Sequence, residues 1–184
     1  MKNIKSYIYN LEARIKKLDL LKIQKIEDII FKKIKEDKKI FVCGNGGSAS
    51  IANHFLCDFN KGIKLSSKNK LKPKIVSLSN NIESILAIAN DISFNKIFSF
   101  QLDNYYTKGD IVILLSCSGS SPNILDVLEY CKKKKIFTIS LTGFAKKNIQ
   151  SKANLNLNFE INNYGISEDL FQIIMHMLSQ SIRL

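Results

Sequence analysis

The sequence contains no hydrophobic run long enough to cross a membrane. The longest candidate, residues 111–115, has only the length of a β-strand. Residues 1–17 alternate lysine with apolar side chains and contain no continuous apolar stretch, so they resemble neither a secretory signal peptide nor a membrane anchor. We therefore expect a cytoplasmic protein with no membrane partner.

The sequence also lacks the cysteine spacing of a metal-binding or disulfide-rich protein. Its four cysteines form no C-x-x-C pair and have no histidines at zinc-finger spacing. This pattern argues against a cysteine zinc site and against a framework of structural disulfides.

Nucleic-acid recognition motifs are missing as well, although the formal net charge is +12. The lysines are spread along the whole chain and do not cluster beside a DNA- or RNA-reading motif. We expect no nucleic-acid partner, and interpret the lysines as solvated helix faces whose charge helps to attract an anionic substrate.

A chain of 184 residues with 45% hydrophobic content can bury one substantial core, so a single domain is expected. Apolar residues at three- and four-residue spacing predict two amphipathic helices, one with Ile4, Ile8, Leu11, Ile15 and Leu18 and one with Ile23, Ile26, Ile30 and Ile34. Short apolar runs predict strands at residues 39–42, 75–78, 111–115, 136–141 and 155–159, and a closing helix is expected over about 167–182.

The alternation of strands and helices predicts an α/β fold with one parallel sheet sandwiched by helices. An amino-terminal helical pair (residues 1–37) would precede the α/β core (residues 38–184), and residues 62–74 are the most loop-like stretch. Because one small sheet leaves the apolar faces of the pair partly uncovered, we expect this pair to mediate association with another subunit.

A glycine-rich corner follows the first predicted strand. Three glycines and two serines, within Gly44 to Ser50, separate this strand from a helix expected to begin near Ala49. Such a corner brings backbone N–H groups close to an anion at the positive end of a helix. It lacks the lysine of a P-loop and the full G-x-G-x-x-G motif, so we expect no nucleotide or redox cofactor.

A second corner, SCSGSSPN (residues 116–123), follows the central predicted strand and contains four hydroxyl groups. Pro122 suits the first helical position, and Ser121 suits the helix cap. Capping would explain only one of the four serines, and open α/β sheets bind ligands at the carboxyl ends of their strands. We therefore predict a phosphate site here.

The two histidines of the chain each have carboxylates at helical spacing. His54 and Asp58 are four residues apart, and Glu168, Gln172 and His176 form a stripe at four-residue intervals. Spacing alone leaves open a packed core histidine, a transition-metal site or an acid/base pair. It also does not show whether the two helices meet.

Together, CGNGGSASIANHF (residues 43–55), SCSGSSPN and the closing E-D-x-x-Q-x-x-x-H stripe resemble the phosphoheptose isomerase branch of the SIS (sugar isomerase) family. The resemblance implies a homotetramer with active sites between subunits and a phosphorylated sugar as substrate. It implies substrate binding by Asn45, Gly46, Ser48, Asp91, Ser116, Cys117, Ser118 and Ser121. It also implies acid/base roles for Asp58, His176 and Glu168, and a possible zinc site formed by His54, Asp58, Glu168 and His176.

The chain departs from the family pattern at several of these positions. Asp58 stands where the family has a catalytic Glu, Glu168 where it has a Gln, and Cys117 where Thr is usual. Gly165 replaces a substrate-binding Asp, and Gly62 falls where an Arg is common. These exchanges indicate a divergent branch and leave open a second alternative, an isomerase that acts on another phosphosugar used in capsule or lipopolysaccharide synthesis.

The resemblance predicts a ketose–aldose isomerase that converts sedoheptulose 7-phosphate into D-glycero-D-manno-heptose 7-phosphate through an enediolate. Its product would serve bacterial heptose, lipopolysaccharide or capsule precursor synthesis. The alternative is a non-catalytic SIS protein, either a sugar-phosphate-binding regulator or a protein that binds the replication initiator. Such a protein would not need both histidines beside carboxylates.

Overall fold

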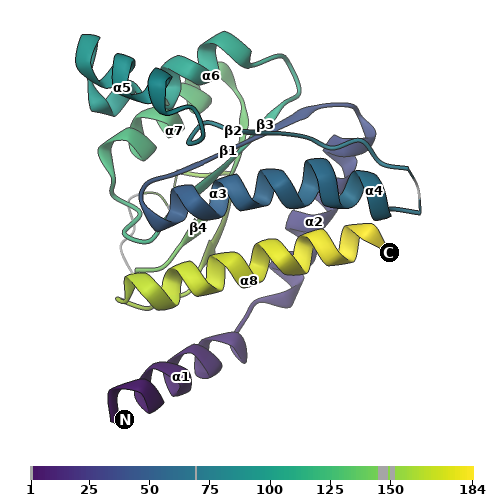
Figure 1. Ribbon diagram of the computed structural model, residues 1–184, viewed down its shortest axis with the longest axis vertical. Helices are drawn as coiled ribbons and strands as arrows, with labels where there is room; N and C mark the ends of the chain where they lie inside the picture. The colour runs from purple at the N-terminus through teal and green to yellow at the C-terminus, as the bar shows by residue number, and fades with distance from the viewer. Residues whose placement is uncertain (1, 69, 145–148, 150–151) are drawn as a thin grey trace.

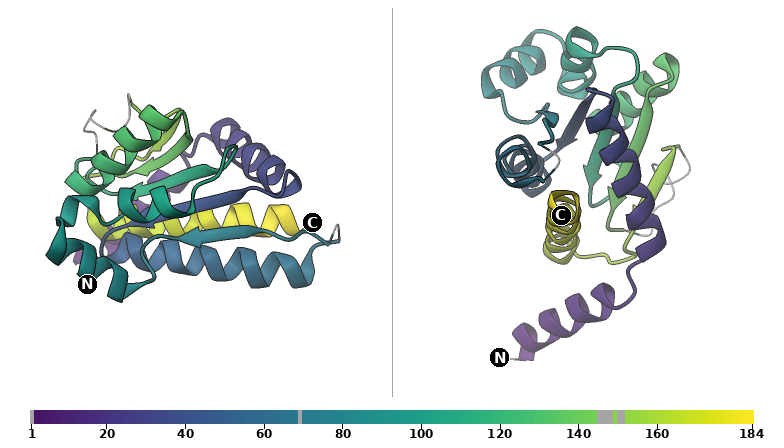
Figure 2. Two further views of the ribbon diagram at one scale, coloured as in Figure 1. Left: turned by 90° about the horizontal axis from the view of Figure 1, so that it is seen from above. Right: turned by 90° about the vertical axis from the view of Figure 1, so that its right-hand side faces the viewer.

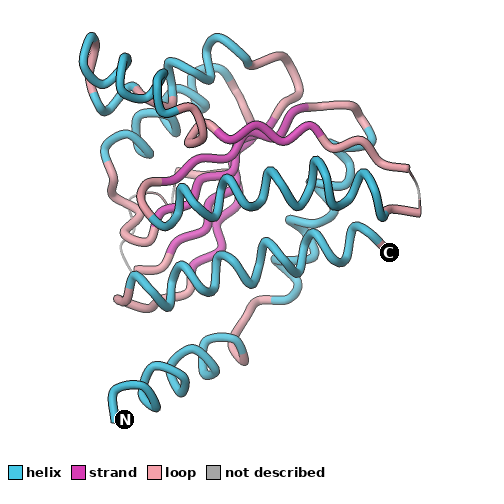
Figure 3. Tube along the Cα trace, viewed as in Figure 1, coloured by secondary structure: helices cyan, strands magenta, loops and turns pink. Residues whose placement is uncertain are grey.

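The computed structural model describes residues 2–68, 70–144, 149 and 152–184. Its centre is a parallel sheet with the order β2-β1-β3-β4-β5 (Figures 1 and 3). The strands are β1 (Lys39–Gly44), β2 (Lys74–Ser77), β3 (Ile111–Ser116), β4 (Phe137–Thr142) and β5 (Leu155–Asn158). The predicted α/β fold with a parallel sheet is confirmed, and each predicted strand is present.

The helices connect these strands and cover both faces of the sheet (Figure 2). In chain order they are α1 (Lys2–Ile15), α2 (Leu20–Lys35), α3 (Gly47–Cys57), the π-helix η1 (Asp58–Ile63), α4 (Lys64–Ser66), α5 (Ile82–Asp91), the 3₁₀-helix η2 (Phe94–Lys96), α6 (Ser99–Tyr105), α7 (Pro122–Lys134) and α8 (Tyr164–Arg183). None of the described helices is long and apolar enough to span a lipid bilayer.

The two faces of the sheet bury separate hydrophobic clusters. In β1, Ile40 and Val42 pack against α2, α3 and α8, whereas Phe41 and Cys43 pack against α5, α6 and α7. Successive strand residues point to opposite faces, so a strand covered on both sides must be apolar throughout. This requirement explains why the central strand was recognisable as an uninterrupted apolar run at residues 111–115.

Several predicted boundaries differ from the structure by one to a few residues. The closing helix begins at Tyr164, three residues before its predicted start, because the side chain of Asn163 caps it by accepting a hydrogen bond from the N–H of Ile166. Helix α3 begins at Gly47, two residues before its predicted start. The predicted loop at residues 62–74 is shorter, since η1 and α4 continue the helical path to Ser66.

The first two helices differ in their environment. Helix α2 buries Ile23, Ile26, Ile30 and Ile34 in the core, while α1 extends away from the sheet and lies near α8 (Figure 1). Ile4, Ile8 and Tyr9 of α1 remain largely exposed. Helix α2 therefore belongs structurally to the α/β core, and the division into residues 1–37 and 38–184 stays a prediction.

Candidate active site

The glycine-rich and serine-rich corners meet at one edge of the sheet. Strands β1 and β3 are neighbours, and the chain turns into α3 after one and into α7 after the other. With the order 2-1-3-4-5, this is the switch point at which open α/β sheets bind ligands. A cavity of about 250 Å³ lies here, lined by Asn45, Gly46, Gly47, Ser48, Leu115, Ser116, Cys117, Ser118, Ser121, Tyr164 and Glu168.

The serine loop presents hydroxyl groups to this cavity. The hydroxyl oxygens of Ser116 and Ser118 accept hydrogen bonds from the N–H groups of Gly119 and Ser120, at 3.1 and 3.2 Å. A serine hydroxyl has one proton and two lone pairs, so both serines keep a proton to donate to a ligand. Both residues line the cavity, so their hydroxyl protons are available to a ligand there.

Ser121 occupies the N-cap position of α7 and Pro122 follows it at the first helical position, as predicted. However, the Ser121 side chain makes no capping hydrogen bond, and the residue lines the cavity. Capping therefore does not use the hydroxyl. The hydroxyl and the first N–H groups of α7 together form a typical anion-binding helix terminus.

Asn45 is held by a partner that the sequence did not reveal. Its amide exchanges two hydrogen bonds with the amide of Asn123, at 2.9 and 2.8 Å, and Asn123 is fully buried. This reciprocal pair links the α3 corner to the first turn of α7. It fixes the two halves of the cavity relative to each other, and Asn45 still lines the cavity.

Glu168 and Asp169 point in different directions. Glu168 lines the cavity and accepts from the thiol of Cys117, at 3.9 Å between Oε1 and Sγ. Burial raises the pKa of that thiol to about 11, so Cys117 stays protonated at neutral pH. Asp169 instead accepts a hydrogen bond of 2.5 Å from the hydroxyl of Tyr7 on α1. Glu168 is therefore the carboxylate that faces the cavity.

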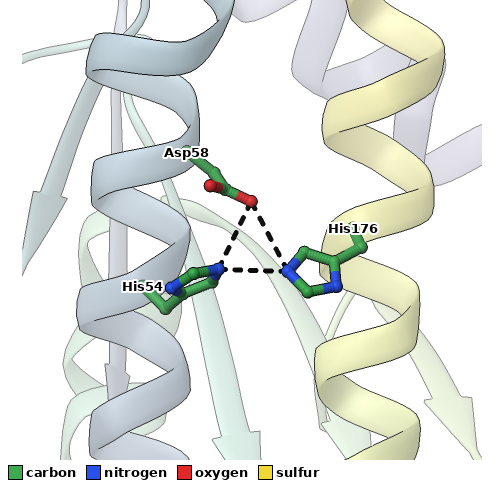
Figure 4. Close-up of side chains that lie close together, drawn as sticks. All are labelled: His54, Asp58 and His176. Atoms are coloured by element: carbon green, nitrogen blue, oxygen red, sulfur yellow. Dashed lines mark hydrogen bonds and ion pairs between the residues drawn. The ribbon is translucent and has the colours of Figure 1, made fainter.

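The two histidines converge, as Figure 4 shows. His54 of α3 and His176 of α8 place their Nε2 atoms 3.0 Å apart, and Oδ2 of Asp58 lies 3.5 and 3.7 Å from them. Both histidine side chains are 48% exposed, so a ligand from solvent can reach them. Gln172, one turn before His176, lies 2.8 Å from the same Nε2. These contacts define the histidine cluster: His54, Asp58, Gln172 and His176.

The histidine cluster fits a zinc ion. The ligand atoms of His54, Asp58 and His176 all lie within 4.8 Å of one another. In a tetrahedral zinc site with bonds of about 2.0 Å, neighbouring ligand atoms are about 3.3 Å apart. The observed separations of 3.0, 3.5 and 3.7 Å are close to this value. Two imidazoles and a carboxylate are a donor set that zinc accepts.

Within this single chain, Glu168 lies apart from the cluster that it was predicted to join, so its role as a metal ligand and acid/base group stays a prediction. Among the described residues, the group that could hold a metal contains only His54, Asp58 and His176. Glu168 lies eight residues before His176 on α8, which places its backbone about 12 Å away along the helix axis. Its carboxylate is directed into the cavity beside Cys117.

A π-helix begins at Asp58. This wide turn, η1, follows α3 directly, and such turns occur often at functional sites. The Arg183 guanidinium donates to the backbone carbonyl of Asp58 at 3.4 Å and fills the space over Gly62, where a Cβ would lie 2.4 Å from Nη2. An arginine from the end of α8 thus occupies the space beside the glycine that stands where the family commonly has an arginine.

Most of the chain matches the model of a known protein family. Residues 5–143 match the model for the SIS domain. The chain belongs to the SIS domain family.

Proteins named phosphoheptose isomerase are similar to this SIS chain. The phosphoheptose isomerase of Helicobacter hepaticus is 32% identical over 160 residues, which cover 87% of this chain and 80% of that protein. The structure of a phosphoheptose isomerase from Francisella tularensis superposes with a TM-score of 0.88 at 24% identity, over 99% of this chain and 95% of the other. The predicted resemblance to a phosphoheptose isomerase-like enzyme is confirmed.

The same fold occurs in a regulator. The sugar isomerase domain of an RpiR transcription factor from Sphaerobacter thermophilus superposes with a TM-score of 0.64 at 14% identity, covering 97% of this chain and 86% of the other. The SIS fold by itself therefore does not decide between an enzyme and a regulator.

One predicted substrate-binding residue lies apart from the cavity. Asp91 ends α5, is exposed, and accepts a hydrogen bond from Asn90. It does not line the cavity of this single chain, so its role stays a prediction. Conversely, Leu115 and Tyr164 line the cavity without having been predicted to do so. Their positions at the end of β3 and at the start of α8 were the available signals.

Proposed function

We propose that this SIS chain is a ketose–aldose isomerase that acts on a phosphorylated sugar, sedoheptulose 7-phosphate, and forms D-glycero-D-manno-heptose 7-phosphate. One observation carries the proposal: α8 joins a hydroxyl-lined anion cavity to a histidine–carboxylate cluster. Glu168 in the cavity and His176 in the cluster are about 12 Å apart along the helix axis. An extended sugar phosphate can span such a distance.

The cavity would bind the phosphoryl end of the substrate. Ser116, Ser118 and Ser121 offer hydroxyl donors, and Ser48 adds one from the first turn of α3. The amino termini of α3 and α7 add N–H groups and the positive ends of two helix dipoles. Hydrogen bonds to a charged group are worth roughly 1.5–3 kcal/mol each, so a few of them suffice to anchor a phosphate.

The histidine cluster would perform the proton transfers. In our proposal, the carboxylate of Asp58 takes the proton from the carbon beside the ketose carbonyl and returns it to the neighbouring carbon. His176 moves a proton between the two oxygens of the enediolate. A carboxylate and an imidazole suit these tasks near neutral pH. A zinc ion held by His54, Asp58 and His176 would add polarisation of the substrate oxygens.

The proposal extends to assembly and pathway. The apolar side chains that α1 leaves exposed support association between copies of the chain, for which we propose a homotetramer. The product would serve as a precursor of bacterial heptose for lipopolysaccharide or capsule.

A sugar-phosphate-binding regulator is the second candidate function, supported by the fold shared with a transcription factor domain. Such a regulator would bind its ligand in the cavity, and the histidine cluster would have no role in its function. The pairing of both histidines with Asp58 favours the enzyme.

Incubation with sedoheptulose 7-phosphate in heavy water, followed by NMR, tests the proposal. We expect the aldose phosphate to appear with deuterium at C2, because the transferred proton exchanges with solvent from a carboxylate. The variant His176→Ala serves as the inactive control. Tight binding of the sugar phosphate, with neither product formation nor deuterium exchange, would contradict the isomerase function and favour the regulator.

A further inference from the structure

The amino-terminal end of the sheet carries a second concave region, which shares no residue with the catalytic cavity. Two adjoining hollows of about 560 and 310 Å³ lie there, and Lys135 and Phe137 line both of them. Ile111, the first residue of β3, lines the larger hollow, whereas the last residue of β3, Ser116, lines the catalytic cavity. We call this region the lysine groove, because its lining includes Lys33, Lys108, Lys132, Lys134, Lys135 and Lys152.

Half of these lysines have no carboxylate to neutralise them. Lys33, Lys134 and Lys152 each have a carboxylate oxygen within 4 Å, but in the part of the chain that the structure describes Lys108, Lys132 and Lys135 form no ion pair. One carboxylate, that of Asp110, lines the groove. It is buried and accepts hydrogen bonds from the N–H groups of Lys39 and Thr107. Three positive charges therefore remain available to an anionic ligand.

Helix stability alone does not account for the lysines at the end of α7. Residues 132–135 are four consecutive lysines, while the carboxyl end of a helix carries only about half a unit of negative charge. Lys135 caps this end with a φ of +57°, a left-handed conformation that glycine or asparagine usually supplies. A lysine held in this unfavourable conformation and directed to a groove points to a function of its side chain.

The groove also contains an aromatic side chain that the core does not use. Phe137 is 36% exposed and belongs to neither of the two hydrophobic clusters formed by the described residues. It begins β4 and lies where the two hollows adjoin, next to Lys135 in the lining of both. An exposed aromatic ring beside lysines is the combination that binds a nucleobase by stacking and its phosphates by charge.

The distribution of carboxylates around the groove favours a small ligand over a nucleic acid. Glu36, Asp103 and Glu129 pair with lysines of the groove and do not line it themselves, so they lie at its margin. An extended polyanion would have to pass these carboxylates, which would repel it. A ligand with a few charges that stays inside the hollows avoids this repulsion.

We propose that the lysine groove binds a nucleoside diphosphate or triphosphate, with its phosphates at Lys108, Lys132 and Lys135 and its base against Phe137. The groove is separate from the glycine-rich corner, at which no nucleotide is expected. Its ligand takes no part in the proton transfers and lies at the opposite end of the sheet from the catalytic cavity. The inference is therefore independent of the proposed isomerase activity.

Titration calorimetry with magnesium-free ATP tests the role of the charges. Lys135→Gly removes the side chain and suits the left-handed backbone, so the variant should fold at least as well as the parent chain. We expect its affinity for ATP to fall by about tenfold, the loss of one charged donor to a phosphate. Lys70→Gly is the matched control, because exposed Lys70 also has a left-handed φ, of +51°, and lies outside the groove.

A comparison of ATP with inorganic tripolyphosphate tests the role of the base. We expect Phe137→Ala to weaken ATP binding at least about fivefold and to leave tripolyphosphate binding unchanged, since base stacking contributes only to the first. Phe94→Ala, at an exposed phenylalanine outside the groove, should change neither affinity. Equal weakening of both ligands in Phe137→Ala would contradict the assignment of the base to Phe137.

Two competition experiments locate the ligand. D-glucitol 6-phosphate, which we expect to occupy the catalytic cavity, should not displace ATP. Displacement would place ATP in the catalytic cavity and overturn the inference, as would a parent chain that does not bind ATP or an equal loss in Lys70→Gly. A decathymidylate that binds more tightly than ATP and loses affinity in Lys135→Gly would make the groove a nucleic-acid surface and also overturn the inference.

Discussion

The cavity and the histidine cluster are built in different ways, although α8 contributes to both. The cavity is formed mainly by two contiguous corners, at the ends of neighbouring strands, and its serines Ser48 and Ser116 are buried. The histidine cluster combines side chains 122 positions apart on the faces of two helices, and its imidazoles are half exposed. A ligand anchor is thus part of the sheet scaffold, whereas the reactive groups lie where helices meet solvent.

Among the substitutions considered, those in the histidine cluster should lower the isomerase activity most. His176→Ala removes a proposed acid/base group, and we expect kcat to fall by about a hundredfold to ten-thousandfold. The melting temperature should change little, since the side chain is half exposed. Steady-state kinetics on sedoheptulose 7-phosphate measure this, with the exposed Gln180→Ala on the same helix as the control. A His176→Ala enzyme with normal kcat would assign the chemistry elsewhere.

Substitutions in the cavity should instead lower the affinity for the substrate. Ser118→Ala removes a hydroxyl donor, and we expect KM to rise by roughly 10- to 100-fold with kcat nearly preserved, the loss of one hydrogen bond to a charged group. Ser120→Ala is the control, because Ser120 belongs to the same loop but does not line the cavity. If both variants raise KM equally, the loop acts through its backbone and not through the Ser118 hydroxyl.

The cavity is built from contiguous segments and the histidine cluster from distant ones, and this difference explains what could be predicted from the sequence. The cavity was predictable because each corner is a continuous motif and adjacent parallel strands bring their carboxyl ends together. The pairing of Asn45 with Asn123 was not, since it depends on the separation of the two corners. No residue pattern indicated the π-helix at Asp58 either.

The predicted role of Glu168 at the metal site stays a prediction, and helix geometry explains why Glu168 lies apart from the histidine cluster within one chain. Residues four apart on a helix are offset by 40° around the axis and about 6 Å along it, so Gln172 reaches His176. Residues eight apart are offset by 80° and about 12 Å. Glu168 therefore leaves the histidine face and enters the cavity. The meeting of α3 with α8 followed from the family resemblance, not from spacing.

Zinc binding is a further property in which we expect the histidine cluster to differ from the cavity. We expect the metal-free chain to bind one zinc ion and His54→Ala to lose more than tenfold in affinity, since even changes beyond the direct ligands cost 10- to 100-fold. Calorimetric titration with zinc measures this without any need for activity. Glu168→Gln is the control, and its zinc affinity should match that of the parent chain. A comparable loss of zinc affinity in Glu168→Gln would show that Glu168 belongs to the metal site.

The smallest effect concerns the contact that joins α1 to α8 next to the cavity. The hydrogen bond to Asp169 is the main reason why the pKa of Tyr7 rises from 10.0 to about 12, with burial and the charge of Glu168 adding to it. Tyr7→Phe should cost about 1 kcal/mol, reduced by solvent exposure from the full value of a hydrogen bond to a charged group, and lower the melting temperature by 2–4 °C.

The pH dependence of this difference identifies its cause. A raised pKa in the folded state means that the stabilisation is complete below pH 10, where the unfolded chain also keeps the phenol proton, and is lost as the pH rises towards 12. The difference in melting temperature between the parent chain and Tyr7→Phe should therefore shrink between pH 9.5 and 12, relative to the value at pH 8. The largely exposed Tyr9→Phe, on the same helix, should show no such difference at any pH. A Tyr7→Phe deficit that stays constant across this range would mean that Tyr7 holds α1 by packing alone.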